Sequence, residues 1–292
     1  MAERTFVRNP ARPFVASQSS LKVSSDCERK FAHQYVWRTP NDSDYEEPLY
    51  YRFGRGFHEI MEHTDGHAGK LRPELLEGIA MSHRLDWEKD IPKLEAMVRA
   101  YDRHRALEEV ILAREVEVVG EDWVLYADAI SEMAGQWWII DYKSIGVALD
   151  PLIRPKLRHD PQVCLYVAHR EQLAKSLGLD PAKFGGFSYR EIEKPRERQK
   201  KNETREQFVA RMVPNCRTTT LTLADLAVEE VMKQLFLRLL SARDLFNDPE
   251  TTVQNRTKCV EKGSRCQFWS QCNGGMTYTE AKASIAEDCD KF

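Results

Sequence analysis

Residues 113–143 contain three consecutive segments with strand character, and the third of them ends in an acid and a lysine. The segments are 113–119 (AREVEVV), 123–131 (WVLYADAIS) and 136–143 (QWWIIDYK), and all are rich in Val, Ile, Trp and Tyr. Helical patterns lie on both sides of this block. This order of segments therefore predicts an α+β or mixed α/β fold built around one central sheet.

The rest of the chain supplies helices before the strands and alternating helices and strands after them. We expect helices over 17–38, 51–64, 73–85, 92–109, 161–177 and 223–246, and further strands at 184–191 and 217–222. We interpret 1–292 as one domain with three parts. These are a helical part (17–112) carrying Cys27 and His58, a core (113–246) and a cysteine-rich tail (250–292).

Asp141 and Lys143 project from one face of their strand, because residues i and i+2 share a face. If the preceding connection is a two-residue turn at Ala134-Gly135, opposed residues have numbers that sum to 269. Asp128 then lies opposite Asp141, and two opposed carboxylates repel each other. A divalent cation would remove the conflict, and oxygen ligands suit Mg²⁺ or Mn²⁺.

Two helical segments place further polar side chains at a spacing of four. His58 and Glu62 share one helical face, and so do Gln162 and Tyr166. Gly54, four positions before the histidine, would allow close backbone approach. Each pair alone has an ordinary structural reading, so their order along the chain carries the information.

That order is G-x3-H-x3-E, an acidic strand, hydrophobic-D-x-K and then Q-x3-Y. Over about residues 19 to 272 it resembles the RecB-like branch of the PD-(D/E)XK nucleases. The resemblance implies a restriction-endonuclease-like core and a metal-dependent DNA nuclease. It implies that Lys143 orients or activates the attacking water and stabilises charge on the phosphate. Gln162 and Tyr166 would position substrate or support the metal shell, and Glu115 is a weaker candidate. The metal ligands that it implies are His58, Asp128, Asp141 and the backbone carbonyl of Tyr142.

Three of the seven cysteines, Cys259, Cys266 and Cys272, lie within 14 residues, and Cys27 lies near the N-terminus. One N-terminal and three C-terminal cysteines resemble the arrangement in iron–sulfur RecB-like nucleases, which include CRISPR-associated single-domain and AddB-type proteins. The resemblance implies that these four cysteines hold a [4Fe–4S] cluster. A Cys₄ zinc site and free thiols are the alternatives, although no C-x2–4-C pair is present. No partner is predicted for Cys164, Cys216 or Cys289.

The charge balance, 43 basic and 46 acidic residues, excludes a wholly basic nucleic-acid coat but allows local basic surfaces. Two candidates for phosphate contact are Lys194–Lys201 and the segment from Arg154 to His159. No apolar run approaches the roughly 18 residues of a membrane span, and no secretory signal is evident. We therefore expect a cytoplasmic protein of a prokaryote or phage.

The function expected from these patterns is a Mg²⁺- or Mn²⁺-dependent exonuclease acting in recombination, repair or DNA processing. Its DNA would be single-stranded or have single-stranded ends. No P-loop motif is present, so a separate helicase, recombinase or CRISPR integrase could be its partner. The alternatives are end trimming in CRISPR adaptation and a non-catalytic DNA-binding subunit with the same fold.

Overall fold

The computed structural model describes residues 14–37, 39, 41–42, 45–146, 148–249, 254, 260–261 and 264–272. The chain divides into two compact units. The sheet unit comprises residues 48–120 and 125–232. The terminal unit comprises residues 1–47, 121–124 and 233–292. The three-part division expected from the sequence stays a prediction.

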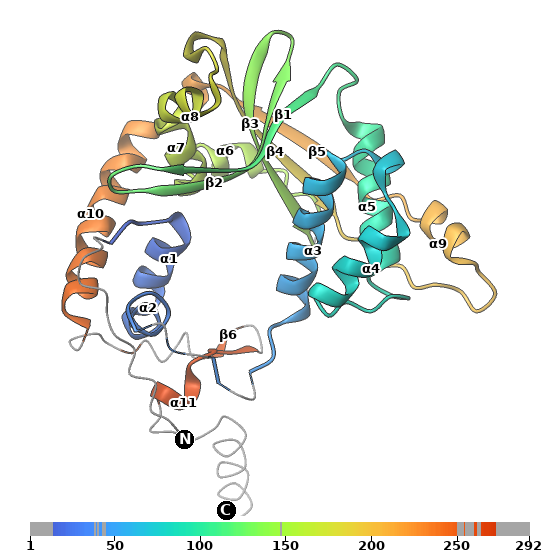
Figure 1. The fold of residues 1–292 in the computed structure, drawn as a ribbon, viewed down its shortest axis with the longest axis horizontal. Helices are drawn as coiled ribbons and strands as arrows, with labels where there is room; N and C mark the ends of the chain where they lie inside the picture. The colour runs from blue at the N-terminus through green and yellow to red at the C-terminus, as the bar shows by residue number, and fades with distance from the viewer. Residues whose placement is uncertain are drawn as a thin grey trace, which may run out of the picture. The chain divides into compact units, whose positions relative to one another are not determined.

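The sheet unit is built on five strands in the order β1-β2-β3-β4-β5 (Figure 1). β2 and β3 pair antiparallel, β3 and β4 pair parallel, and β4 and β5 pair antiparallel. The mixed central sheet predicted from the sequence is therefore confirmed. The strands are β1 (Val110–Val119), β2 (Val124–Met133), β3 (Gln136–Ile145), β4 (Phe184–Glu193) and β5 (Cys216–Leu221).

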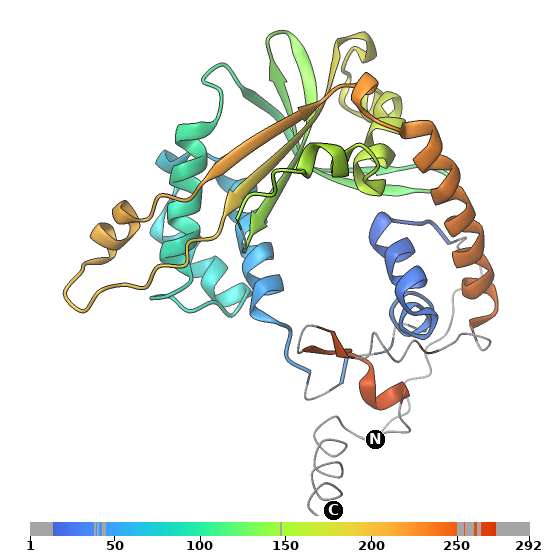
Figure 2. The ribbon, with the colours of Figure 1, turned by 180° about the vertical axis from the view of Figure 1, so that it is seen from behind.

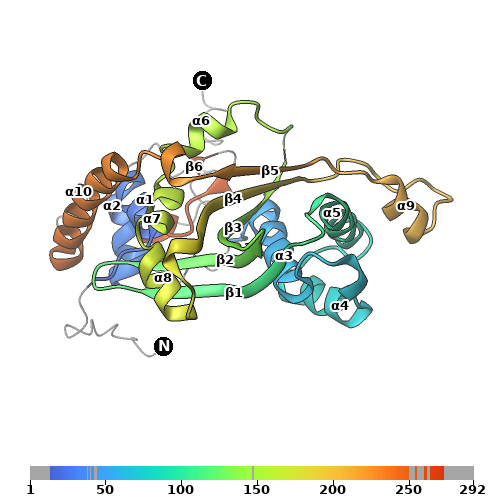
Figure 3. The ribbon, with the colours of Figure 1, turned by 90° about the horizontal axis from the view of Figure 1, so that it is seen from above.

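Helices lie on both sides of this sheet. In Figures 1 and 3, α3, α4 and α5 lie together on one side, and α7 and α8 lie on the other. Ile140 and Tyr142 of β3 belong to the apolar core formed with α3, α4 and α5. The alternate residue Asp141 faces α7. The helices of this unit are α3 (Leu49–Thr64), α4 (Pro73–Ser82), α5 (Ile91–His104), α6 (Ile153–Leu157), α7 (Pro161–Ala168), α8 (Arg170–Leu177) and α9 (Arg205–Arg211).

The connection between β2 and β3 is the predicted two-residue turn. Ala134 and Gly135 have φ of 53° and 74°, the left-handed pair of a type I′ hairpin. The paired residues run from Met133 opposite Gln136 to Ala129 opposite Ile140, so every pair sums to 269. The register predicted from the sequence is confirmed, and its next pair would be Asp128 and Asp141.

Four of the predicted helices differ from the structure. The helix expected over 17–38 is interrupted at Cys27, whose backbone is extended with φ of −162° and ψ of 109°. The helix expected to reach residue 109 ends at His104, and the chain then enters β1. The helix expected over 161–177 is split at His169, whose Nδ1 lies 2.9 Å from the Leu165 carbonyl oxygen. The helix expected from 223 begins at Val228, because Thr222 caps a short 3₁₀ turn before it.

The terminal unit joins both ends of the described chain. Its elements are α1 (Gln18–Asp26), α2 (Glu28–Phe31), a π-helical turn (Ala32–Val36), most of α10 (Val228–Asn247), β6 (Val260–Glu261), β7 (Ser264–Arg265) and α11 (Trp269–Cys272). Figure 2 shows α1 and α2 beside α10. The Phe14 ring contacts Phe31 and Phe246 at centroid distances of 5.5 and 5.3 Å. His33 stacks on the buried Phe268 at 5.2 Å, so the first helices hold the C-terminal segment.

No helix in the described part of the chain is long and apolar enough to cross a membrane.

A buried ion pair in the sheet unit joins Arg190 of β4 to Glu109, the residue before β1. Arg190 of β4 is 4% exposed and Glu109 is 7% exposed. The Arg190 guanidinium donates to both Glu109 carboxylate oxygens, with Nη1–Oε2 at 2.8 Å, and to the Tyr101 hydroxyl. It also lies over the rings of Tyr101 and Tyr142. This pair explains why the chain leaves α5 early, since Glu109 must reach Arg190.

We expect Arg190→Ala to lower the free energy of unfolding by about 3–5 kcal/mol, because it leaves the Glu109 carboxylate buried without its partner. Arg99→Ala is the matched control. Its guanidinium pairs with Glu95 at 2.8 Å but is half exposed, so the loss is less than about 1 kcal/mol. Urea unfolding of both variants measures the difference, and equal losses would contradict the role given to the buried pair.

Candidate active site

Asp141 and Lys143 form a close pair near the end of β3. Lys143 Nζ lies 2.9 Å from both carboxylate oxygens of Asp141, and Asp141 is 2% exposed. Burial raises the pKa of Asp141 to about 6; Lys143 opposes this rise and the charge of Asp128 adds to it. Burial would lower the pKa of Lys143, but the two acids outweigh it and the pKa is raised. The lysine therefore stays charged beside its acid.

Asp128 of β2 contacts both β3 and α3. Its Oδ2 accepts a hydrogen bond from the backbone N–H of Tyr142 at 2.7 Å, which ties β2 to β3 just beyond the pair Ala129–Ile140. Asp128 Oδ2 also lies 3.3 Å from His58 Nδ1 on α3. Burial would lower the pKa of His58, but the hydrogen bond and charge of Asp128 raise it overall. The imidazole and this carboxylate are thus held together as a pair.

Helix α7 brings Gln162 and Tyr166 to the same acid. Gln162 Nε2 donates to Asp141 Oδ1 at 3.2 Å and lies 2.8 Å from the Tyr166 hydroxyl. The Tyr166 hydroxyl donates to the backbone carbonyl of Tyr126 on β2. Asp160 caps α7 by accepting from the N–H groups of Gln162 and Val163, an Asp-Pro start that the sequence signals. The cap fixes the direction in which Gln162 points.

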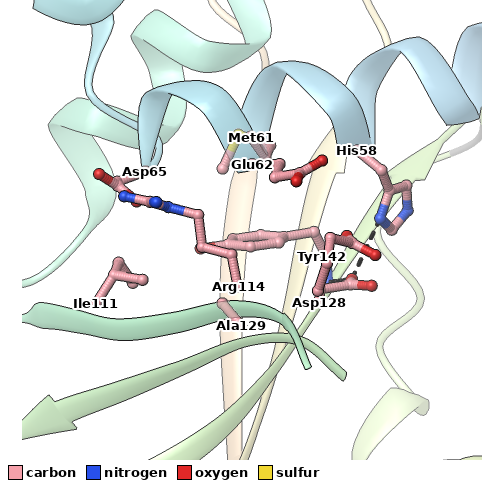
Figure 4. A pocket seen from close by; sticks show the side chains of 10 residues that line it. His58, Met61, Glu62, Asp65, Ile111, Arg114, Asp128, Ala129 and Tyr142 are labelled. Carbon is pink, nitrogen blue, oxygen red and sulfur yellow. Dashed lines mark hydrogen bonds and ion pairs between the residues drawn. The ribbon is translucent and has the colours of Figure 1, made fainter. Parts of the chain in front are cut away.

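Two further carboxylates gather beside Asp128. Figure 4 shows His58 and Glu62 projecting from α3 above Asp128. Together with Glu115 they line a small cavity of about 10 Å³, room for about one water molecule. Glu115 has φ of +42°, and the burial alternation of β1 shifts there, as at a β-bulge. Burial raises the pKa of Glu115, with Asp128 and Glu62 adding to the rise.

All of the side chains predicted for the site lie in one connected group in the sheet unit. His58, Asp128, Asp141, Lys143, Gln162 and Tyr166 are linked by the contacts above, and Tyr142 is linked by its backbone N–H. Their individual roles stay predictions. The reading of Gly54 is wrong. A Cβ there would lie 3.8 Å from Ser144 Oγ, an ordinary contact, whereas at Gly56 it would meet Leu85 at 2.9 Å.

The donor set fits a hard divalent cation. Asp128, Asp141, Glu62 and Glu115 supply carboxylate oxygens, and His58 supplies an imidazole nitrogen. Burial is the main cause of the raised pKa values of Asp141 and Glu115, and the charge of Asp128 adds to both, a repulsion that a bound cation would relieve. In the described part of the chain, however, no three His, Cys, Asp or Glu side chains are already close enough to hold a metal ion. The ligands would have to draw together on binding.

A comparison with known families shows to which superfamily the chain belongs. The family model described as the PD-(D/E)XK nuclease superfamily matches residues 15–273. The chain belongs to the PD-(D/E)XK nuclease superfamily. Members are nucleases that act on DNA, and they generally use divalent metals such as Mg²⁺ or Mn²⁺. The D-x-K spacing of Asp141 and Lys143 on β3 agrees with the (D/E)XK element in the superfamily's name, and their catalytic role stays a prediction.

One solved structure shares the fold of this PD-(D/E)XK protein. It is a presumed exonuclease from Eubacterium rectale, which aligns over 95% of this chain and 94% of its own with a TM-score of 0.53. Sequence identity is 13%, so this likeness bears on the fold alone. No curated protein sequence matches the chain significantly.

In the basic segment from Arg154 to His159, two of the side chains form ion pairs. Arg154 lies 2.9 Å from Asp225, and Lys156 pairs with Asp150. Arg158 and His159 are exposed next to α7. In the other segment, Lys194 lies over the Phe53 ring of α3 at 3.6 Å. Both segments belong to the sheet unit, as the site does.

The cysteines group in the terminal unit. Cys27, Cys266 and Cys272 line one small cavity together with Lys30, Gln254, Phe268 and Trp269. Cys259, the fourth predicted ligand, and Cys289 lie outside the described residues. Cys164 is buried in α7, and Cys216 is half-buried at the start of β5, both in the sheet unit. Three of the four predicted ligands thus line one cavity, although among the described residues they are not close enough together to hold a metal ion.

Proposed function

We propose that this protein is a Mg²⁺- or Mn²⁺-dependent deoxyribonuclease that hydrolyses phosphodiester bonds at DNA ends. The observation that carries the proposal is the buried Asp141 bonded to Lys143, with Asp128 and His58 on the adjacent strand and helix. Superfamily membership supports nuclease chemistry. Action as an exonuclease in recombination, repair or DNA processing is the finer part of the proposal.

His58, Asp128, Asp141 and the Tyr142 carbonyl would hold the cation, and Glu115 would complete the set. A bound divalent cation supplies an activated water and stabilises negative charge on phosphate. Lys143, kept charged beside Asp141, places its ammonium where it can orient the water and stabilise the oxyanion. Gln162 and Tyr166 hold Asp141 in position from α7.

The test uses purified protein with end-labelled single-stranded and double-stranded DNA and with covalently closed circles. We expect cleavage of linear DNA with Mn²⁺ or Mg²⁺, none with EDTA, and stepwise shortening from the ends. Cleavage of circles at the same rate would show an endonuclease instead. DNA binding without cleavage under every metal condition would support the non-catalytic subunit and end the catalytic proposal.

Metal binding should stabilise the protein more at pH 8 than at pH 5. The folded-state pKa of Asp141 is about 6, above its usual 3.8, so metal-free stability falls as pH rises through this window. Above pH 6 the ionised carboxylate is available to the cation. At 100 times Kd we expect Mn²⁺ to raise Tm by roughly 5 °C or more at pH 8 and by much less at pH 5. Thermal melts with and without EDTA measure this, and equal shifts would contradict the ligand role of Asp141.

We also propose that Cys27, Cys259, Cys266 and Cys272 hold a [4Fe–4S] cluster in the terminal unit. The support is that three of these cysteines line a single cavity although Cys27 is far from the others in sequence. Thiolates suit such a cluster, and phosphodiester hydrolysis moves no electrons, so the cluster would be structural. It would tie α2 to α11 and couple metal binding to folding of the terminal unit. Cys₄ zinc is the alternative occupant.

A further inference from the structure

The first turn of α3 carries two adjacent tyrosines on the surface. Tyr50 and Tyr51 are 51% and 55% exposed, and their ring centroids lie 4.3 Å apart at an interplanar angle of 38°. Leu49 beside them is 43% exposed. Large side chains so exposed contribute little to the core of the sheet unit. A cluster of them on the surface of a DNA enzyme needs another explanation.

The helix connects this pair to the candidate active site. On an α-helix, residues 7 apart lie on the same face, so Tyr51 and His58 share a stripe with the exposed Arg55 between them. The rise of 1.5 Å per residue places Tyr51 roughly 10 Å along the axis from His58. A strand with bases about 3.4 Å apart covers that distance in about three steps. A base on Tyr51 would therefore lie two or three nucleotides from the reacting phosphate.

Positive charge lies next to the same turn. The segment Lys194–Lys201 holds five basic residues and one acidic residue. Lys194 Nζ lies 3.6 Å from the centre of the Phe53 ring. The backbone N–H of Lys194 donates a hydrogen bond to the Ile145 carbonyl oxygen at 2.7 Å. Arg196 donates to the Gly146 carbonyl at 3.1 Å. The segment is thus anchored both to the first turns of α3 and to the end of β3 that carries Asp141 and Lys143.

We propose that Tyr50 and Tyr51 form a stacking platform for unpaired bases of a DNA strand whose phosphates contact Lys194–Lys201. This rests on the proposed nuclease function and names its substrate as a single strand or a single-stranded end. Aromatic faces bind any base by stacking, and basic side chains bind the backbone without regard to sequence. A duplex cannot use the platform, because its bases are already stacked on each other.

The decisive experiment measures binding of fluorescein-labelled dT20 by anisotropy in EDTA, so that it does not depend on cleavage. Because one stacked base contributes about 1–3 kcal/mol, Tyr51→Ala should weaken binding by roughly 5- to 100-fold. Tyr51→Phe should bind like wild type, since the ring is kept. Phe236→Ala, which removes another half-exposed aromatic from helix α10, is the matched control and should change nothing.

Cleavage assays then locate the base. With wild-type protein, an abasic nucleotide two or three positions from the cleaved bond should raise KM and leave kcat nearly unchanged. With Tyr51→Ala, the same abasic nucleotide should have no further effect, because the variant lacks the ring on which the missing base would stack. Replacing Arg196, Arg198 and Lys200 by Gln should reduce the salt dependence of dT20 binding, whereas Tyr51→Ala should not.

The platform and the nuclease proposal can fail separately. If wild type cleaves DNA but Tyr51→Ala binds dT20 within twofold of wild type, the platform is wrong and the nuclease stands. If Tyr51→Phe loses as much affinity as Tyr51→Ala, stacking is not the interaction and the platform is again wrong. If no DNA is cleaved but the binding differences appear, the platform stands and the catalytic proposal falls.

Discussion

Asp141→Asn and Lys143→Ala are each expected to lower the rate of DNA cleavage by about 10³-fold while the protein stays folded. The Asn variant removes the charge of a carboxylate that is 2% exposed, and with it the ability to hold a cation. The Ala variant removes the ammonium placed to stabilise the oxyanion, and loss of one such donor typically costs 10²–10³-fold. Single-turnover cleavage of end-labelled DNA with Mn²⁺ measures both.

Glu132→Gln is the control for these variants. Glu132 is a carboxylate of the same hairpin, but it is exposed and lies opposite Trp137, away from the site. We expect wild-type cleavage from it. Near wild-type rates from either site variant, with unchanged metal dependence, would show that the D-x-K pair is not the catalytic centre.

The second large effect is expected in the terminal unit. Protein purified without oxygen should be brown, absorb near roughly 400 nm and contain about four irons per chain if the cluster is cubane. Cys27→Ala and Cys272→Ala should remove colour and iron and lower solubility, because α2 and α11 lose their common anchor. Iron analysis and absorption spectra of each variant measure the loss.

Cys164→Ala and Cys216→Ala are the matched controls. Both belong to the sheet unit and neither lines the cavity of Cys27, Cys266 and Cys272, so the iron content of these variants should equal that of wild type. Loss of iron from either would mean that the ligand set is wrong. Colourless protein with one zinc per chain would replace the cluster with a Cys₄ zinc site and leave the nuclease proposal untouched.

Local sequence patterns predicted the hairpin and, together with the resemblance to a known family, predicted which side chains gather at the candidate site. The left-handed pair Ala134-Gly135 sets a two-residue turn, and the turn sets the register that brings Asp128 toward Asp141. The spacings of His58 and Gln162 on their helices follow from helical periodicity. Each of these depends on residues within a few positions of one another, and the resemblance to a known family supplied their grouping.

Features that depend on distant residues could not be predicted. The bulge at Glu115 interrupts the alternation of β1, and no glycine or proline marks it. The early end of α5 depends on Arg190, 81 residues away from Glu109. The grouping of residues 121–124 with the two ends of the chain likewise has no local signal. Sequence periodicity describes one element at a time, and these features arise from pairs of elements.

The hairpin register has a further consequence for how this site can vary. Asp128 and Asp141 come together only because the number of residues between them is fixed by a turn of two. One inserted residue in that turn could shift the pairing by one position, and a shift of one sends a side chain to the other face of the sheet. The spacing of 13 positions is therefore as much a part of the candidate active site as the two carboxylates. We therefore expect this hairpin to tolerate substitutions between the two carboxylates better than insertions or deletions.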